Sequence, residues 1–108
     1  MKGVVVAPVE QLPVERGVAA LVGDESVAVF RLHDGEILAI DHVEPFTGVP
    51  VLARGLVGST GDTVYVASPL HKQRFDLRTG RCLDDPAVAV RTWPVDVVDG
   101  MVQLRPAS

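Results

Sequence analysis

The sequence predicts an all-β protein, a small antiparallel sandwich or barrel. Valine is the most abundant of the 108 residues, and β-branched residues favour strands. Ten glycines and eight prolines indicate many turns, because these residues interrupt regular structure. Asp-Gly pairs also separate short alternating apolar segments, which is the strongest short-range indication of a β-hairpin. No segment shows the periodicity of a long helix.

Four short apolar runs in the first half of the chain are expected to be strands: GVVVAPV (3–9), GVAALVG (17–23), SVAVFRL (26–32) and EILAID (36–41). The Gly23-Asp24 pair is expected to turn the chain between the second and third of these strands. Asp34-Gly35 is expected to do the same between the third and fourth, because both central residues of such a turn can take positive φ.

The second half is expected to contribute five more short strands: TVYVA (63–67), RFDL (74–77), AVAVR (87–91), WPVDVV (93–98) and MVQL (101–104). Asp99-Gly100 should join the last two as a hairpin. The segment VLARGLVG (51–58) is ambiguous between a strand and a helical turn. Residues 42–50 and 68–74 are predicted to be irregular loops. Since each directly follows a strand, we expect the two loops to converge at one end of the barrel.

Length and charge limit the possible functions. A chain of 108 residues has the size of one domain, so 1–108 is expected to fold as a single unit. The formal net charge of −4 offers no general attraction for nucleic acid. The lone Cys82 excludes an intramolecular disulfide. No apolar stretch approaches the ~20 residues of a membrane helix, and there is no signal-peptide core, so we expect a cytoplasmic protein without a membrane partner.

The two loops carry a recognisable pattern. The second loop and the residues after it read SPLHKQRFDLRTG (68–80), and the first loop contains HVEPFTG (42–48). They resemble the cluster-binding loops of Rieske proteins, in which two cysteines and two histidines hold a [2Fe–2S] cluster. The resemblance places Glu44, Phe46, Ser68 and His71 at the four ligand positions. Because such a cluster needs two thiolates, and the only cysteine lies in neither loop, we predict no iron–sulfur cluster on this chain.

Within the Rieske-like fold, the sequence is similar to the small subunits of cytoplasmic NAD(P)H-dependent nitrite reductases along nearly its whole length. The segments that carry this resemblance are VLARGLVG (51–58), PLHKQRFDLRTGRCL (69–83) and VRTWPVDVVDGMV (90–102). The resemblance implies an accessory subunit with no catalytic, metal or cofactor site of its own. It implies a large-subunit partner that carries FAD, siroheme and an iron–sulfur cluster and reduces nitrite to ammonia in nitrate assimilation.

Loops that lack a metal need other partners for their backbone groups. We expect Phe46 to fill the space with apolar contacts, so that Phe46→Ala costs about 3–5 kcal/mol if the ring is fully buried. Ser68 is expected to hydrogen-bond a loop amide, and Glu44 is expected to pair with His71 across the two loops. A single loop histidine is more often a structural hydrogen bonder than a metal ligand, and we interpret His71 in that way.

The region of the second loop also carries four basic residues on an otherwise acidic chain: Lys72, Arg74, Arg78 and Arg81. They are either a docking face for a partner or ordinary solvated charges, and the sequence does not separate these two interpretations. His33, next to a tight turn, is expected to be exposed and idle. Cys82 is expected to be a small buried hydrophobe, and Trp93 to lie in the core or in an interface.

Three other functions can be considered for the same residues, and the hydrolase is the least supported of them. His42, Glu44 and His71 are the ligand types of a mononuclear iron or zinc site, although nothing in the sequence sets their geometry. Ser68 and His71 lack the nucleophile elbow and oxyanion glycines that a hydrolase would need. The chain is also compatible with a Rieske-like accessory module of some other oxidoreductase, because a fold does not define a function.

Overall fold

The computed structural model describes residues 3–106, and apart from two short 3₁₀ turns the regular elements in this range are antiparallel strands. They form four small sheets, with strand orders β1-β11-β10, β2-β3-β4, β5-β6 and β7-β8-β9. The strands are β1 (Val4–Pro8), β2 (Gly17–Val22), β3 (Glu25–Arg31), β4 (Ile37–Asp41), β5 (Val43–Glu44), β6 (Val49–Pro50), β7 (Leu56–Thr60), β8 (Thr63–Ala67), β9 (Arg74–Asp76), β10 (Val95–Val98) and β11 (Met101–Leu104). The predicted all-β fold is confirmed.

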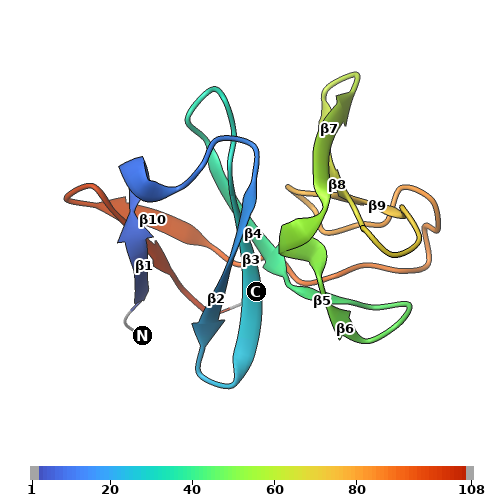
Figure 1. Ribbon diagram of the computed structural model, residues 1–108, viewed down its shortest axis with the longest axis horizontal. Coiled ribbons are helices and arrows are strands. Elements are labelled where there is room, and N and C mark those ends of the chain that lie inside the picture. The colour runs from blue at the N-terminus through green and yellow to red at the C-terminus, as the bar shows by residue number, and fades with distance from the viewer. Residues whose placement is uncertain (1–2, 107–108) are drawn as a thin grey trace.

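The β2-β3-β4 sheet lies in the middle of the molecule, with β1 and β10 on one side and β7 to β9 on the other (Figure 1). Four consecutive residues of β3, positions 27–30, are buried, because both faces of this strand are covered. Alternate side chains of β3 therefore enter two different cores. The first core contains Val27, Val29, Trp93, Val102 and Leu104; the second contains Ala28, Phe30, Leu52, Val66 and Phe75.

The Asp-Gly turns differ from one another. Asp99 and Gly100, between β10 and β11, have φ of 51° and 77°, so both take the positive values that the predicted tight hairpin requires. At the other pair only Gly35 has positive φ, 94°. There the chain makes a longer turn, in which Asp34 Oδ1 accepts the N–H of Glu36 at 2.9 Å. The same dipeptide thus produced a two-residue hairpin at one position and an Asp-stabilised loop at the other.

The predicted strand at 87–91 is wrong. This segment makes one isolated bridge, Arg81 with Ala89, rather than a continuous ladder. Its neighbour Gly80 has φ of 78°, and a Cβ there would lie 2.1 Å from the Val90 carbonyl oxygen. Val90 in turn donates its N–H to the Gly80 carbonyl at 2.8 Å. The segment therefore pairs with residues 80–82 at one isolated antiparallel bridge, which is too short to form a strand.

The ambiguous segment 51–58 contains both predicted structures. Leu52–Arg54 form the 3₁₀ turn η2, and β7 begins two residues later. Gly55, between the two, passes so close to β8 that a Cβ would lie 2.3 Å from the Ala67 carbonyl oxygen. Only glycine permits this approach. It places η2 beside the point where β8 ends and the second loop begins.

Candidate functional site

The first loop is built around the carboxylate of Glu44, which is fully buried. Its Oε1 accepts the N–H of Phe46 at 2.7 Å, and its Oε2 accepts the N–H and the hydroxyl of Thr47 at 3.0 and 2.6 Å. A buried carboxylate is costly unless it is hydrogen-bonded, and here the loop supplies the donors. Strands β5 and β6 pair beside it. The predicted irregular loop is therefore a small hairpin folded around one charged side chain.

The predicted pair between Glu44 and His71 is wrong. The carboxylate of Glu44 is used inside its own loop, and the ion pairs found within residues 3–106 do not join it to His71. His71 lies exposed on the turn of the second loop. The hydrogen bonds of that described turn involve Ser68 and backbone groups rather than the imidazole, so the structural role predicted for His71 is also wrong.

His42 connects the first loop to the 3₁₀ turn. Its ring is buried, and Nδ1 accepts the N–H of Ala53 at 3.0 Å. Its backbone carbonyl accepts the N–H groups of Val51 and Leu52 at 3.1 and 3.0 Å. Burial, and after it the nearby charge of Arg54, lower the pKa of His42 below its ordinary value. His42 is therefore a neutral structural residue whose acceptor nitrogen is already occupied.

The second loop is closed by its own backbone around Ser68, which is buried. Ser68 donates its N–H to the Gln73 carbonyl at 2.8 Å, and its carbonyl accepts the N–H of Lys72 at 2.9 Å. Its hydroxyl oxygen accepts the N–H of Leu70 at 3.3 Å, which confirms the predicted bond to a loop amide. Lys72 has a φ of 62°, a conformation that is uncommon for a residue with a Cβ.

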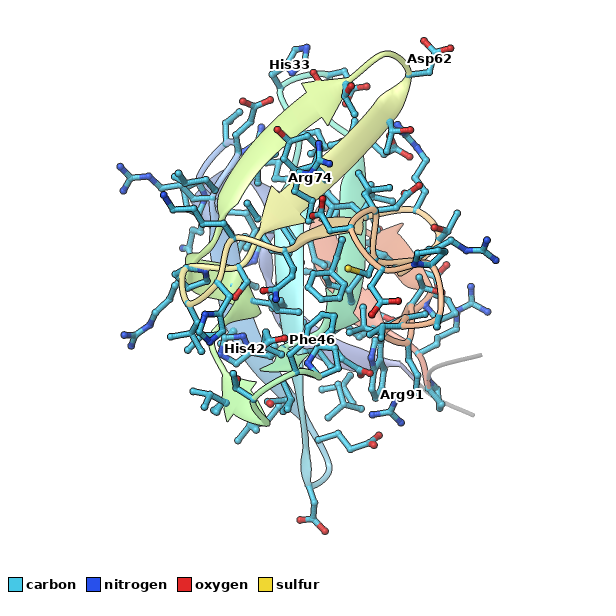
Figure 2. The ribbon with its side chains drawn as sticks, turned by 90° about the vertical axis from the view of Figure 1, so that its right-hand side faces the viewer. His33, His42, Phe46, Asp62, Arg74 and Arg91 are labelled. Atoms are coloured by element: carbon cyan, nitrogen blue, oxygen red, sulfur yellow. The ribbon has the colours of Figure 1, made fainter. Side chains whose placement is uncertain are left out.

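The two loops meet through an aromatic contact. The ring of Phe46 lies 6.3 Å, between centroids, from the ring of Phe75, at an interplanar angle of 49°. Phe75 belongs to β9, directly after the second loop, and is buried, whereas Phe46 is 39% exposed. Figure 2 shows Phe46 and His42 together on this end of the molecule. The prediction that Phe46 fills a buried space is thus only partly right, because the ring covers Phe75 from outside.

The four positions that match Rieske ligands form two pairs by burial. Glu44 and Ser68, at the cysteine positions, are buried, and Phe46 and His71, at the histidine positions, are exposed. The donors do not fit a [2Fe–2S] cluster, which takes thiolates at the first pair and imidazoles at the second. Phe46 has no donor atom, and both carboxylate oxygens of Glu44 already accept hydrogen bonds from their own loop. Cys82 is buried opposite Phe75, outside both loops, as predicted for a small hydrophobe.

The mononuclear metal alternative finds no support either. Within residues 3–106, no group of three or more His, Cys, Asp or Glu side chains is arranged to hold a metal ion. The three proposed ligands have different environments: His42 bonds to Ala53, Glu44 bonds to its own loop, and His71 is exposed.

The basic residues near the second loop do not form one free patch. Arg74 makes a bidentate ion pair with Asp84, with Nη2 2.8 Å from Oδ1 and Nε 3.2 Å from Oδ2. Arg78 pairs with Glu36. Of the four candidates, Lys72 and Arg81 alone are without a carboxylate partner in the part of the chain that the structure describes. The charge available for docking is therefore smaller and differently placed than the sequence indicates.

Two other expectations can be compared with the structure. His33 is exposed but not idle, because its Nδ1 lies 2.8 Å from Glu15 Oε2, and this bond raises the pKa of His33. Trp93 lies in the core as expected, with Nε1 donating to Asp41 Oδ1 at 2.9 Å. Asp41 also accepts the N–H and Nε of Arg91, each at 3.0 Å. Sequence reasoning missed this anchor, because Asp41 lies 50 positions from Arg91 and 52 from Trp93.

Comparisons with known proteins agree with this geometry. Residues 4–105 match the family described as the Rieske-like [2Fe–2S] domain. The small subunit of nitrite reductase (NADH) from Escherichia coli K12 is 43% identical over 101 residues, which cover 93% of this chain and 94% of that protein. A crystal structure from Mycobacterium tuberculosis, of a protein named as an NADH-dependent nitrite reductase small subunit, has a TM-score of 0.93 and 41% identity, and the match covers 99% of this chain and 97% of the other.

A third relative has a different organisation. The nitrite reductase [NAD(P)H] large subunit of Klebsiella oxytoca contains a segment that is 41% identical to this chain over 97 residues. The match covers 90% of this chain but only 10% of that protein. A domain similar to this chain therefore also occurs as part of a polypeptide that is named a large subunit.

The chain belongs to the Rieske-like [2Fe–2S] domain family and, within it, to the nitrite reductase small subunits. The family predicted from the loop pattern is thereby confirmed. Within residues 3–106, no helix is long and apolar enough to cross a membrane.

Proposed function

We propose that this chain is a non-catalytic subunit that binds the large subunit of an NAD(P)H-dependent nitrite reductase. The observation that carries the proposal is the Klebsiella oxytoca large subunit, in which a segment similar to this chain is covalently part of the large-subunit polypeptide. A domain that occurs both as a separate chain and as a segment of the large subunit is expected to lie against the same catalytic body in both cases.

The proposed division of labour follows from the donor chemistry of the loops. The large subunit, as the resemblance implies, carries FAD, siroheme and an iron–sulfur cluster and performs the six-electron reduction of nitrite to ammonia. This chain carries no cofactor, because two bridged irons need thiolate ligands that its loops do not offer. Its contribution is to complete or stabilise the large subunit, in the cytoplasm and in the service of nitrate assimilation.

The loops support this role because each is held in shape by hydrogen bonds of its own residues. Glu44 organises the first loop by three hydrogen bonds, and the backbone turn around Ser68 closes the second. A surface that is ordered before binding loses less entropy when a partner docks. The end of the molecule that carries metal ligands in Rieske proteins is here a preorganised protein surface.

The experiment that tests the proposal is co-expression of the tagged chain with the nitrite reductase large subunit of the same organism. We expect a complex of constant ratio on size exclusion, and a higher yield or nitrite-dependent NAD(P)H oxidation rate than the large subunit shows alone. The isolated chain should be colourless and contain only trace iron and sulfide. A red-brown isolated chain with stoichiometric iron, or a large subunit that neither binds the chain nor changes with it, would contradict the proposal.

The same experiment separates the remaining alternative. If the tagged chain fails to bind the nitrite reductase large subunit but forms a constant-ratio complex with a purified oxygenase or another reductase, the Rieske-like accessory role stands and the nitrite assignment falls.

A further inference from the structure

A hollow of about 310 Å³ lies between the 3₁₀ turn and the second loop. Its lining comes from η2, from the beginning of β7, from the end of β8 and from the second loop: Arg54, Leu56, Ala67, Ser68, Pro69 and Lys72. The close approach of Gly55 to Ala67 brings these two sides together. The volume is at the small end of the roughly 300–1,000 Å³ that small-molecule sites occupy, so the hollow has room for one or two side chains rather than for a cofactor.

Two cations line this hollow, Arg54 and Lys72. Within residues 3–106 neither makes an ion pair, whereas Arg74, Arg78, Arg91 and Arg105 each have a carboxylate partner. Although the chain has a net charge of −4, this hollow is thus lined by two cations and by no carboxylate. The charge of Arg54 already acts on its surroundings, because it helps to lower the pKa of His42. The electrostatic complement of this hollow is a carboxylate.

The hollow is also lined by exposed apolar surface. Leu56 is 78% exposed, the highest exposure among the large hydrophobic residues of the described chain. Ala67 and Pro69 contribute further apolar area to the lining. Leu56 therefore offers a partner apolar area to bury in the same hollow where Arg54 and Lys72 offer charge to pair.

The same face continues toward β2. A second hollow of about 430 Å³ shares Arg54 and Leu56 with the first, and its further lining includes Glu15 and Arg16. Glu15 forms an ion pair with His33. Arg16 is the cation that this second hollow adds. Arg54 and Leu56 thus stand at the centre of a surface that has cations on both sides.

We propose that this surface, defined by Arg54, Leu56 and Lys72, is the docking site for an acidic and apolar segment of the nitrite reductase large subunit. The carboxylates of that segment would pair with Arg54 and Lys72, and an apolar side chain would cover Leu56 and enter the hollow. The inference rests on the proposed function for the identity of the partner, but the surface itself is chosen by charge and exposed apolar area. Arg74, Arg78 and Arg81 of the sequence-predicted patch lie outside it.

The test is a binding titration of purified large subunit with the wild-type chain and four variants. Arg54→Glu/Lys72→Glu reverses the charge of the hollow, and Leu56→Asp places a carboxylate at its apolar centre. Two matched controls lie outside the surface: Arg81→Glu reverses another cation without a carboxylate partner within residues 3–106, and Leu21→Asp changes a leucine that is 69% exposed on β2. Thermal melts of all five proteins should be similar, because the changed side chains are at the surface.

We expect the two hollow variants to raise the Kd by roughly 10- to 100-fold, as residues at the centre of an interface do. The controls should remain within about threefold of wild type. The double charge reversal should also reduce the dependence of Kd on salt, because it removes attractive ion pairs. The proposal is overturned if the hollow variants bind as wild type does, or if the controls lose as much affinity.

These results are distinct from a failure of the proposed function. If the hollow variants bind as tightly as the wild-type chain, the subunit assignment stands and the contact lies elsewhere on the surface. A wild-type chain that does not bind the large subunit at all overturns both.

Discussion

The two loops at the end of the molecule keep their shape by different means. The first loop is folded around a buried charge, the Glu44 carboxylate, which accepts three hydrogen bonds from its own neighbours. The second is closed mainly by its backbone, with the N–H and the carbonyl of Ser68 both bonded within the turn. The first loop therefore depends on one side chain, whereas the second depends on the path of its main chain.

These hydrogen bonds explain how a Rieske-like domain can keep both loops in shape although its residues at the ligand positions do not fit a cluster. A metal cluster would cross-link the loops directly. Here each loop makes hydrogen bonds within itself, and an aromatic contact joins Phe46 of the first loop to Phe75, directly after the second. The first loop should accordingly be sensitive to a single substitution, and the second should tolerate one. The predictions below test that contrast.

The largest effect is expected for Glu44→Ala. The substitution leaves two N–H groups and one hydroxyl of the first loop without their acceptor, and it empties the fully buried position of the carboxylate around which the loop folds. We expect a loss of about 3–5 kcal/mol in the free energy of unfolding, measured by urea denaturation. Glu44→Gln, which keeps one carbonyl acceptor, should lose less. A Glu44→Ala protein as stable as Ser68→Ala would remove the distinction between the loops.

A smaller loss is expected for Phe46→Ala. The ring is 39% exposed, so the 3–5 kcal/mol expected for a fully buried phenylalanine does not apply. Truncation removes the contact with Phe75 and part of the apolar burial, and we expect about 1–2 kcal/mol. Phe46→Leu, which keeps an apolar cover over Phe75, serves as the control and should retain most of the stability. A loss above about 3 kcal/mol would mean that this ring holds the loops together more firmly than its exposure indicates.

Ser68→Ala should cost about 1 kcal/mol or less. The hydroxyl accepts one hydrogen bond, from Leu70 at 3.3 Å, while the backbone bonds of Ser68 persist in the variant. The same denaturation experiment measures this value beside that of Glu44→Ala. A loss of several kcal/mol would show that the second loop, like the first, depends on a side chain.

The smallest effect concerns pH. Since burial lowers the pKa of His42, the unfolded chain binds a proton that the folded chain does not, in the interval below the ordinary value of about 6.5. The contribution of His42 to stability is therefore complete above that value and is lost as pH falls through the interval. Stability measured from pH 7.5 down to 5.5 should decline less steeply in His42→Asn, in which the amide oxygen replaces Nδ1 as acceptor.

His33 provides the opposite control. Its bond to Glu15 raises the pKa of His33, so its contribution is complete below the ordinary value and is lost as pH rises through the raised one. Removing it by His33→Gln should therefore make the decline of stability toward low pH steeper. If both variants shift the profile in the same direction, the assignment of the neutral form to His42 is wrong.

The strands were largely predictable because their signals are local. The alternating runs that became β2, β3, β8 and β11 were found with nearly correct limits, and Asp99-Gly100 turned as expected. Prediction failed at 87–91, where the alternating run makes one isolated bridge, between Arg81 and Ala89, instead of a continuous ladder. It also failed at 43–50, where a two-residue pairing around Glu44 is too short for any periodicity to show.

By itself, the sequence determined the fold class, the family and the donor chemistry of the loops. Residue type and spacing are enough for these, since a phenylalanine has no ligand atom and a lone cysteine cannot supply two thiolates wherever the chain places them. Only the tertiary structure decided which charges are compensated. Arg74 meets Asp84 and Arg78 meets Glu36, while Arg54 and Lys72 line a hollow beside an exposed leucine. Electrostatic energy depends on distances through space, and these arise from strands and turns far apart in the sequence.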